Sequence, residues 1–227
     1  MKPQHHPDSS SLMSYAAGSL PDSIATVIAC HVSTCEQCQR NVAEAEQLGR
    51  FLMESSLPEQ SEEESQHIDL APNARDDILA LIDSDEYVEP QVVVESDVQE
   101  APSDVPLPLQ PLLGKSLDNL LWKSMAPGLK QFVLPATSGT LRLLRIAPGT
   151  SMPIHSHTGS EVTLVLRGSY YDEMGRFGAG DVADLDPEVE HQPATATGED
   201  CICLIATDAP LKFSGLVPRL LQPFFQL

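Results

Sequence analysis

An acidic stretch in the middle of the chain most constrains how its 227 residues can fold. Residues 54–104 carry 16 acidic side chains and one basic side chain, Arg75, so the rest of the chain holds a charge near −5 out of a formal −20. The acidity is therefore regional. Together with a length above the usual single-domain size, it favours two modest domains joined by a linker over one large core.

The first of these domains, residues 1–86, is predicted to be all-α. Apolar residues recur there at spacings of three and four, which places them on one face of a helix, and Pro21 suits the first turn of a helix. The expected helices lie between Asp8 and Leu20, from Pro21 to about His31, from Glu36 to about Glu54, and from about Asn73 to Asp83. A loop or ragged helix rich in Glu, Ser and Gln is expected between Leu57 and Leu70.

The amino-acid composition of the remaining chain changes twice. Residues 87–111 combine acidic side chains with repeated prolines, which predicts an extended, semi-rigid linker. Residues 112–227 show short apolar runs separated by glycines, a pattern typical of a β-sandwich or β-barrel. The expected strands cover 131–134, 140–146, 162–166, 182–185 and 201–206. The predicted fold class is thus a multidomain α+β protein.

A cluster of potential zinc ligands occurs in the helical domain, where His31, Cys35 and Cys38 are separated by three and two residues. Steps of three and four return to the same face of a helix, so the three side chains can converge. Two thiolates and an imidazole fill three positions of a tetrahedral zinc site, and His6 is the candidate for the fourth. The alternative is a pair of small buried thiols beside a histidine at a helix C-terminus.

A second cluster lies in the predicted barrel. His155 and His157 are two residues apart and so project to the same side of a strand, Glu161 follows shortly after, and His191 comes from a distant strand. Three imidazoles and a carboxylate suit zinc, manganese, iron or nickel. Gly149 and Gly168 flank the first three ligands where turns require positive φ, and the whole spacing resembles the metal motif of cupin barrels. The alternative is a surface His-x-His with an unrelated glutamate.

Charge and cysteine content narrow the function classes. A strongly acidic chain is repelled by nucleic acid and by anionic membranes, which favours a basic protein partner. The N-terminus lacks a secretory signal and no apolar run is long enough to span a bilayer, so a cytoplasmic location is expected. Five cysteines are too few and too clustered for a disulfide scaffold. Cys201 and Cys203 are candidates either for oxidation or for simple burial in the core.

The two metal motifs, in this order, resemble the zinc-binding anti-sigma factors of ChrR type, which join an N-terminal anti-sigma domain to a C-terminal cupin-like domain. The resemblance covers nearly the whole chain. Besides both metal motifs, the resemblance rests on the segments His5-His6, Tyr15-Ala16-Ala17-Gly18, Phe177-Gly178-Ala179-Gly180-Asp181, Cys201-Ile202-Cys203 and Pro218-Arg219-Leu220-x-Gln222-Pro223-Phe224-Phe225.

The resemblance implies a regulator and not an enzyme. The helical domain would bind and inhibit a group IV (extracytoplasmic-function) sigma factor, and the cupin would sense singlet oxygen or related oxidants and promote release of the sigma factor. It further implies structural zinc on His6, His31, Cys35 and Cys38, and zinc or another divalent transition metal on His155, His157, Glu161 and His191. The alternative hypothesis is a metal-dependent cupin enzyme, a dioxygenase or isomerase, with a zinc-stabilised helical appendage.

Overall fold

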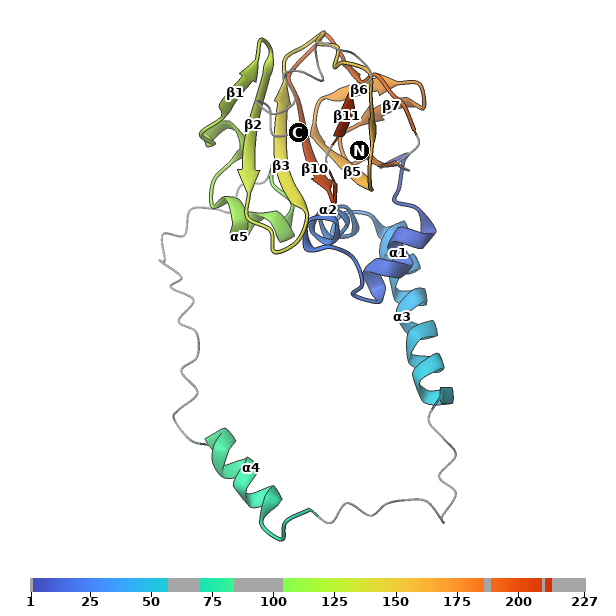
Figure 1. Cartoon of the computed structure of the whole chain (residues 1–227), viewed down its shortest axis with the longest axis vertical. Helices are drawn as coiled ribbons and strands as arrows, with labels where there is room; N and C mark the ends of the chain where they lie inside the picture. Colours follow the sequence, from blue (N-terminus) through green and yellow to red (C-terminus); the bar gives the residue numbers. More distant parts are fainter. Residues whose placement is uncertain (1, 57–69, 84–103, 186–188, 210, 214–227) are drawn as a thin grey trace. The chain divides into compact units, whose positions relative to one another are not determined.

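The computed structural model describes residues 2–56, 70–83, 104–185, 189–209 and 211–213 (Figure 1). The described residues up to Arg50 and from Asp104 onward form one compact unit, and those between Phe51 and Glu100 belong to a second. The four predicted helices are confirmed as α1 (Ser9–Ala16), α2 (Asp22–Val32), α3 (Glu36–Ser56) and α4 (Ala74–Asp83). The predicted loop before Leu70 and the motif at 218–225 lie outside the described residues.

The C-terminal part of the chain is built from antiparallel strands, as predicted. A six-stranded sheet has the order β1-β2-β3-β10-β5-β8, and two smaller sheets have the orders β11-β4 and β7-β6-β9. The strands are β1 (Lys123–Ala126), β2 (Leu129–Leu134), β3 (Thr140–Ile146), β4 (His155–His157), β5 (Glu161–Arg167), β6 (Ser169–Asp172), β7 (Gly175–Gly178), β8 (Val182–Leu185), β9 (Ala194–Thr195), β10 (Cys201–Thr207) and β11 (Leu211–Phe213).

The central strands β3, β5 and β10 of the large sheet are buried on both faces, which explains why they appear as continuous apolar runs and not as alternating ones. In β10, Ile202 and Leu204 face the helices, whereas Cys201 and Cys203 face the inside of the barrel. Successive residues of a strand point to opposite faces, so one strand contributes to two cores. Burial of each large apolar side chain contributes about 1.5–3 kcal/mol, so both cores stabilise this sheet.

Helix α2 covers the outer face of this sheet against β10 and β5 (Figure 1). Its side chains Ile24, Val27 and Ile28 are buried in the same apolar cluster as the outward-facing residues of the strands. Asp22, at the start of the helix, accepts a hydrogen bond from the Thr137 backbone N–H over 2.9 Å, which attaches the helix to the loop between β2 and β3. The N-terminal helices α1 and α2 therefore share a core with the barrel.

The predicted extended linker at 87–111 is wrong at its C-terminal end. The structure has a 3₁₀ helix η1 (Leu107–Leu109) followed by α5 (Gln110–Leu113), and a further 3₁₀ turn η2 (Leu117–Asn119). Each of the first two carries proline in its first turn, where a missing N–H costs nothing. Proline therefore begins helices in this segment. Leu109 is fully buried in the core shared with α2. Residues 87–103 lie outside the described part of the chain.

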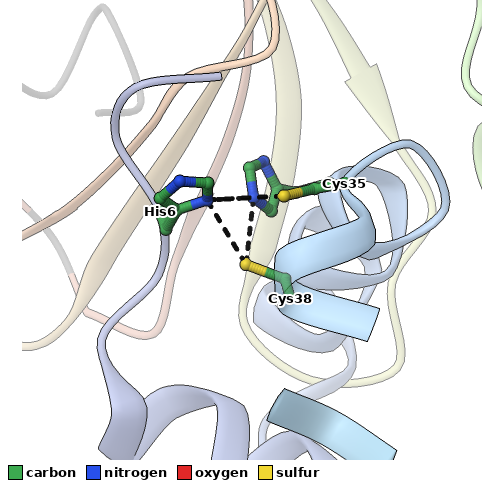
Figure 2. A group of neighbouring side chains, drawn as sticks. His6, Cys35 and Cys38 are labelled. Carbon is green, nitrogen blue, oxygen red and sulfur yellow. Dashed lines mark hydrogen bonds between the residues drawn. The ribbon is translucent and has the colours of Figure 1, made fainter. Parts of the chain in front are cut away.

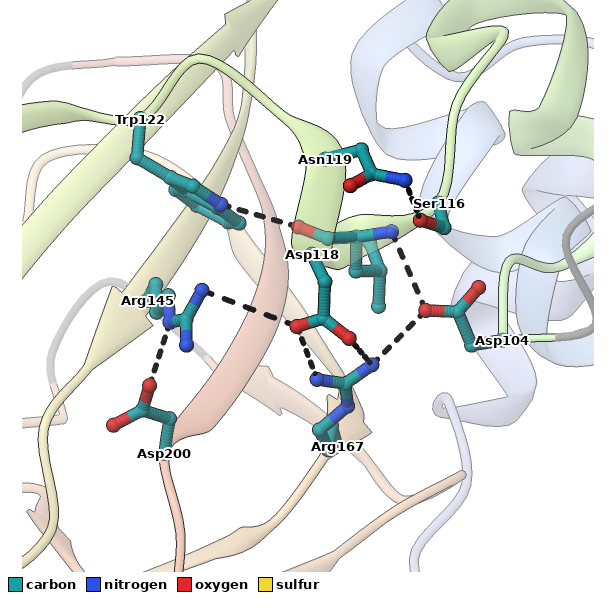
Figure 3. Close-up of polar contacts among 9 residues, drawn as sticks. Asp104, Ser116, Asp118, Asn119, Trp122, Arg145, Arg167 and Asp200 are labelled. Carbon is teal, nitrogen blue, oxygen red and sulfur yellow. Dashed lines mark hydrogen bonds and ion pairs between the residues drawn. The ribbon is translucent and has the colours of Figure 1, made fainter.

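A polar network holds this segment against the sheet (Figure 3). The Arg167 guanidinium on β5 donates to Asp118 over 2.8 Å and to Asp104 over 3.0 Å. Arg145 on β3 donates from Nε to Asp200 over 2.6 Å. These ion pairs are half exposed, so their role is chiefly to fix where the segment crosses the strands.

Candidate metal sites

Four side chains from separate elements converge near the N-terminus, and Figure 2 shows three of them facing one another. His6 precedes α1, His31 lies in the last turn of α2, Cys35 immediately precedes α3, and Cys38 lies in the first turn of α3. One potential ligand atom from each lies within 4.8 Å of all the others. The structure thus brings together all four residues that the sequence proposed for this cluster.

The distances within this cluster match those expected around one tetrahedral ion. The Nδ1 atom of His6 lies 3.3 Å from Nε2 of His31 and 3.4 Å from the sulfur atoms of Cys35 and Cys38. Zinc with ordinary bond lengths would separate two nitrogens by about 3.3 Å and a nitrogen from a sulfur by about 3.6 Å. The four donor atoms therefore fit a zinc ion at their centre.

Hydrogen bonding fixes the tautomer of His31. Its Nδ1 lies 2.9 Å from the carbonyl oxygen of Gly180, which can only accept, so Nδ1 carries the proton and Nε2 faces the cluster with a free lone pair. Burial lowers the pKa of His31 and raises the pKa of the Cys38 thiol to about 12. A bound cation would reverse the shift at Cys38, because a coordinating thiol loses its proton.

The barrel cluster unites His155 on β4, Glu161 on β5 and His191, again with ligand atoms within 4.8 Å of one another. The Nε2 atoms of the two histidines are 3.1 Å apart, and all three residues are buried. The backbone of His157 pairs with β11, but its side chain lies outside the described residues. Three of the four predicted barrel ligands are therefore placed together, and His157 stays a prediction.

Two acceptors that the sequence did not identify orient the barrel histidines. Asp172 lies 3.0 Å from Nδ1 of His191, and the carbonyl oxygen of Pro153 lies 2.9 Å from Nδ1 of His155. In both rings the proton is therefore on Nδ1, and Nε2 is the atom that could coordinate a cation, an arrangement typical of metal-ligating histidines. No spacing signal connects Asp172 with His191, because strand pairing brings them together.

Burial shifts the pKa values of the carboxylate and imidazole ligands of the barrel in opposite directions. It raises the pKa of Glu161 to about 7 and lowers the pKa of His155 to about 4. The imidazole of His155 is thus a neutral ligand at physiological pH, whereas Glu161 holds a proton below pH 7 when no cation is bound. Arg142 contributes a smaller electrostatic effect that favours the carboxylate form of Glu161.

Metal binding to the barrel should depend on pH through Glu161. A cation must displace the proton of this residue, so we expect affinity to fall about tenfold per pH unit as the pH drops below 7. Mn²⁺ prefers oxygen ligands to thiolates, so a titration with Mn²⁺ measures binding to the barrel cluster alone. The Glu161→Gln variant should bind more weakly with a flatter dependence, and an equally steep slope in that variant would contradict this assignment.

The barrel ligands border an internal cavity that is otherwise mainly apolar, with Leu144, Ile146 and Met152 in its lining. Cys203 also borders it, and its sulfur lies 3.6 Å from that of Cys201. The hydrogen bond with Cys201, together with burial, raises the pKa of Cys203 well above its ordinary value. A thiol with a raised pKa is a poor nucleophile, and both cysteines are buried, which favours the core interpretation of the pair over oxidation.

Comparison with known proteins identifies the family. Residues 113–210 match the ChrR cupin-like domain. The anti-sigma-E factor ChrR of Cereibacter sphaeroides is 36% identical to this chain over 225 residues, which is 99% of each protein. The chain belongs to the ChrR family of anti-sigma factors. A crystal structure of Rhodobacter sphaeroides SigE in complex with the anti-sigma ChrR matches 91% of this chain and all of that one, with 34% identity and a TM-score of 0.71.

This membership confirms several expectations from the sequence. The ChrR resemblance and the cupin barrel are correct, and the chain is a regulatory protein and not an enzyme. The cluster of His6, His31, Cys35 and Cys38 offers the ligands of a metal site in the N-terminal region. Among the described helices, none has both the length and the apolarity needed to cross a bilayer.

Proposed function

We propose that this chain binds and inhibits a group IV (extracytoplasmic-function) sigma factor in the cytoplasm, through an anti-sigma domain at residues 1–86. The observation that carries the proposal is the likeness to ChrR, which extends over 99% of the chain and so includes both the helices and the barrel. The matching crystal structure is itself a complex with a sigma factor. The expected partner is therefore one protein, with no direct contact to nucleic acid or membrane.

The exposed apolar side chains of α4 support this proposal. In a helix of ten residues, Ile78, Leu81 and Ile82 are 58%, 70% and 68% exposed. An amphipathic helix that leaves its apolar side uncovered is suited to bind in a groove of another protein. The final turns of α3 likewise expose Phe51 and Met53, at 64% and 73%.

The two clusters would each hold one ion. Two thiolates and two imidazoles favour zinc at the N-terminal cluster, where it would clamp three chain segments around one point. The barrel cluster, with imidazole and carboxylate ligands, would take zinc or another divalent transition metal. In this proposal the barrel responds to an oxidant such as singlet oxygen and shifts the helical domain toward release of the sigma factor.

Co-expression of the full chain with an extracytoplasmic-function sigma factor and a reporter of its promoter tests the proposal. We expect a stable complex and a silent promoter. We expect Leu81→Asp to weaken binding by at least tenfold, because it would place a charge where the complex buries an apolar side chain. Leu121→Asp is the matched control, since Leu121 is 84% exposed on the barrel unit. Normal promoter activity with every sigma factor of the source organism would refute the proposal.

A further inference from the structure

The N-terminal segment that carries His6 lies along a turn of the barrel, the turn between β7 and β8 at Gly178–Val182. One carboxylate oxygen of Asp181 accepts hydrogen bonds from the backbone N–H groups of Gln4 and His5, over 2.6 and 3.0 Å. The N–H of Val182 in turn donates to the carbonyl oxygen of His5 over 3.1 Å. Three hydrogen bonds thus fix the backbone immediately before a metal ligand.

The barrel side of this contact is equally well held. The second carboxylate oxygen of Asp181 accepts from the N–H of Gly178 over 2.8 Å, and the side chain is only 6% exposed. Burial opposes the charge of Asp181, but the backbone donors outweigh it and hold the pKa of this carboxyl below its ordinary range. Farther along, Asp184 on β8 accepts from the N–H of Asp8 over 3.0 Å. His6 therefore lies between two anchored positions.

The same turn also orients His31. Its Nδ1 donates to the carbonyl oxygen of Gly180, a residue with φ of +93°. A Cβ atom at this position would lie 3.3 Å from Cγ of Pro3, so glycine suits both the backbone conformation and the close approach of the N-terminal segment. Two ligands of the N-terminal cluster are thus positioned by hydrogen bonds that span between 149 and 177 positions of the sequence.

We propose that the turn Gly178–Val182 is a positioning element of the N-terminal metal site: Asp181 fixes the segment that carries His6, and the Gly180 carbonyl orients His31. The inference rests on the proposed occupancy of the cluster by zinc. Ordering a mobile terminal segment is unfavourable in conformational entropy, and a segment already held by hydrogen bonds binds the ion with less of that loss. Loss of such an outer partner typically weakens metal binding by about 10–100-fold.

Strand β8 links this arrangement to the barrel cluster. Its first residue, Val182, binds the N-terminal segment, and its last residue, Leu185, pairs with the barrel ligand Glu161 on β5. The four residues of β8 therefore connect the N–H group that donates to His5 with the strand partner of the barrel ligand Glu161. A displacement of β8 caused by the barrel site would reach the backbone that holds His6.

Cobalt binding to the full-length protein tests the proposal, because the cobalt–thiolate charge-transfer absorption reports the Cys35 and Cys38 site and is silent for a barrel site of nitrogen and oxygen ligands. We expect Asp181→Ala to weaken cobalt binding at the thiolate site by about tenfold or more. Asp181→Asn keeps one acceptor oxygen and should recover part of the affinity. Asp200→Ala is the matched control, since Asp200 is a barrel carboxylate bound to Arg145.

The possible results separate the positioning role of the turn from the metal site and from sigma binding. Unchanged cobalt affinity in Asp181→Ala would overturn the positioning role while leaving the anti-sigma function intact. A wild-type protein without the thiolate absorption would overturn the metal site and this inference with it, but not sigma binding, which the reporter assay measures separately. Should Asp181→Ala fail to fold, Gly180→Ala tests the other half of the proposal, because backbone strain at this position displaces the carbonyl that orients His31. Normal cobalt affinity in that variant would equally contradict the proposal.

Discussion

Replacement of His31 by alanine is expected to remove the N-terminal metal and abolish inhibition of the sigma factor. The fully buried imidazole supplies one of four ligands, and its loss leaves two buried thiols whose deprotonation depends on the ion. Structural zinc contributes about 10–16 kcal/mol in small zinc domains, which is comparable to the whole stability of an ordinary domain. We expect zinc content to fall by about one equivalent and the promoter to become active.

His5→Ala provides a matched control for this experiment. His5 is the neighbour of a ligand, but its ring packs against Phe177 with centroids 4.4 Å apart and takes no part in the cluster. Alanine keeps the backbone groups of this residue that bind Asp181 and Val182. Its replacement should leave zinc content and inhibition unchanged. A His31→Ala protein that retains its zinc and still silences the promoter would show that the helices need no metal clamp.

Replacement of His191 by alanine should remove the barrel metal but leave inhibition of the sigma factor intact. The barrel cluster loses a buried ligand that Asp172 holds in its coordinating tautomer, and we expect its metal affinity to fall by more than about 100-fold, beyond the effect of an outer partner. The N-terminal cluster shares no ligand with it, so inhibition should persist. Exposure to singlet oxygen should then release less sigma factor than from the unaltered protein.

Metal analysis and the reporter assay with and without the oxidant measure both consequences. Asp172→Asn is the graded comparison, because it weakens the orientation of His191 without removing a ligand, and we expect about a 10–100-fold loss of barrel metal affinity. Full oxidant response in a His191→Ala protein that contains no barrel metal would separate the sensor from the metal site. Loss of inhibition in that variant would show that the barrel ion supports the helical region as well.

Much of the fold could be predicted from local patterns. Apolar spacing located α1 to α4 to within a few residues, and the five strands expected from short apolar runs correspond to β2, β3, β5, β8 and β10. The strands that were missed, such as β6 and β7, are four residues long and contain polar residues, so no periodic signal marks them. The helices at 107–113 were missed because proline was taken as a sign of extended chain, although it also begins helices.

The sequence by itself determined which side chains can form each metal cluster, because ligand spacing is a local property. His31, Cys35 and Cys38 lie close together in the sequence where α2 ends and α3 begins, and His155 and Glu161 lie on consecutive strands. Only the tertiary structure decided what orients them. The carbonyl of Gly180 and the carboxylates of Asp172 and Asp181 reach their partners through strand pairing and packing over long sequence separations, and no periodicity of the chain records such contacts.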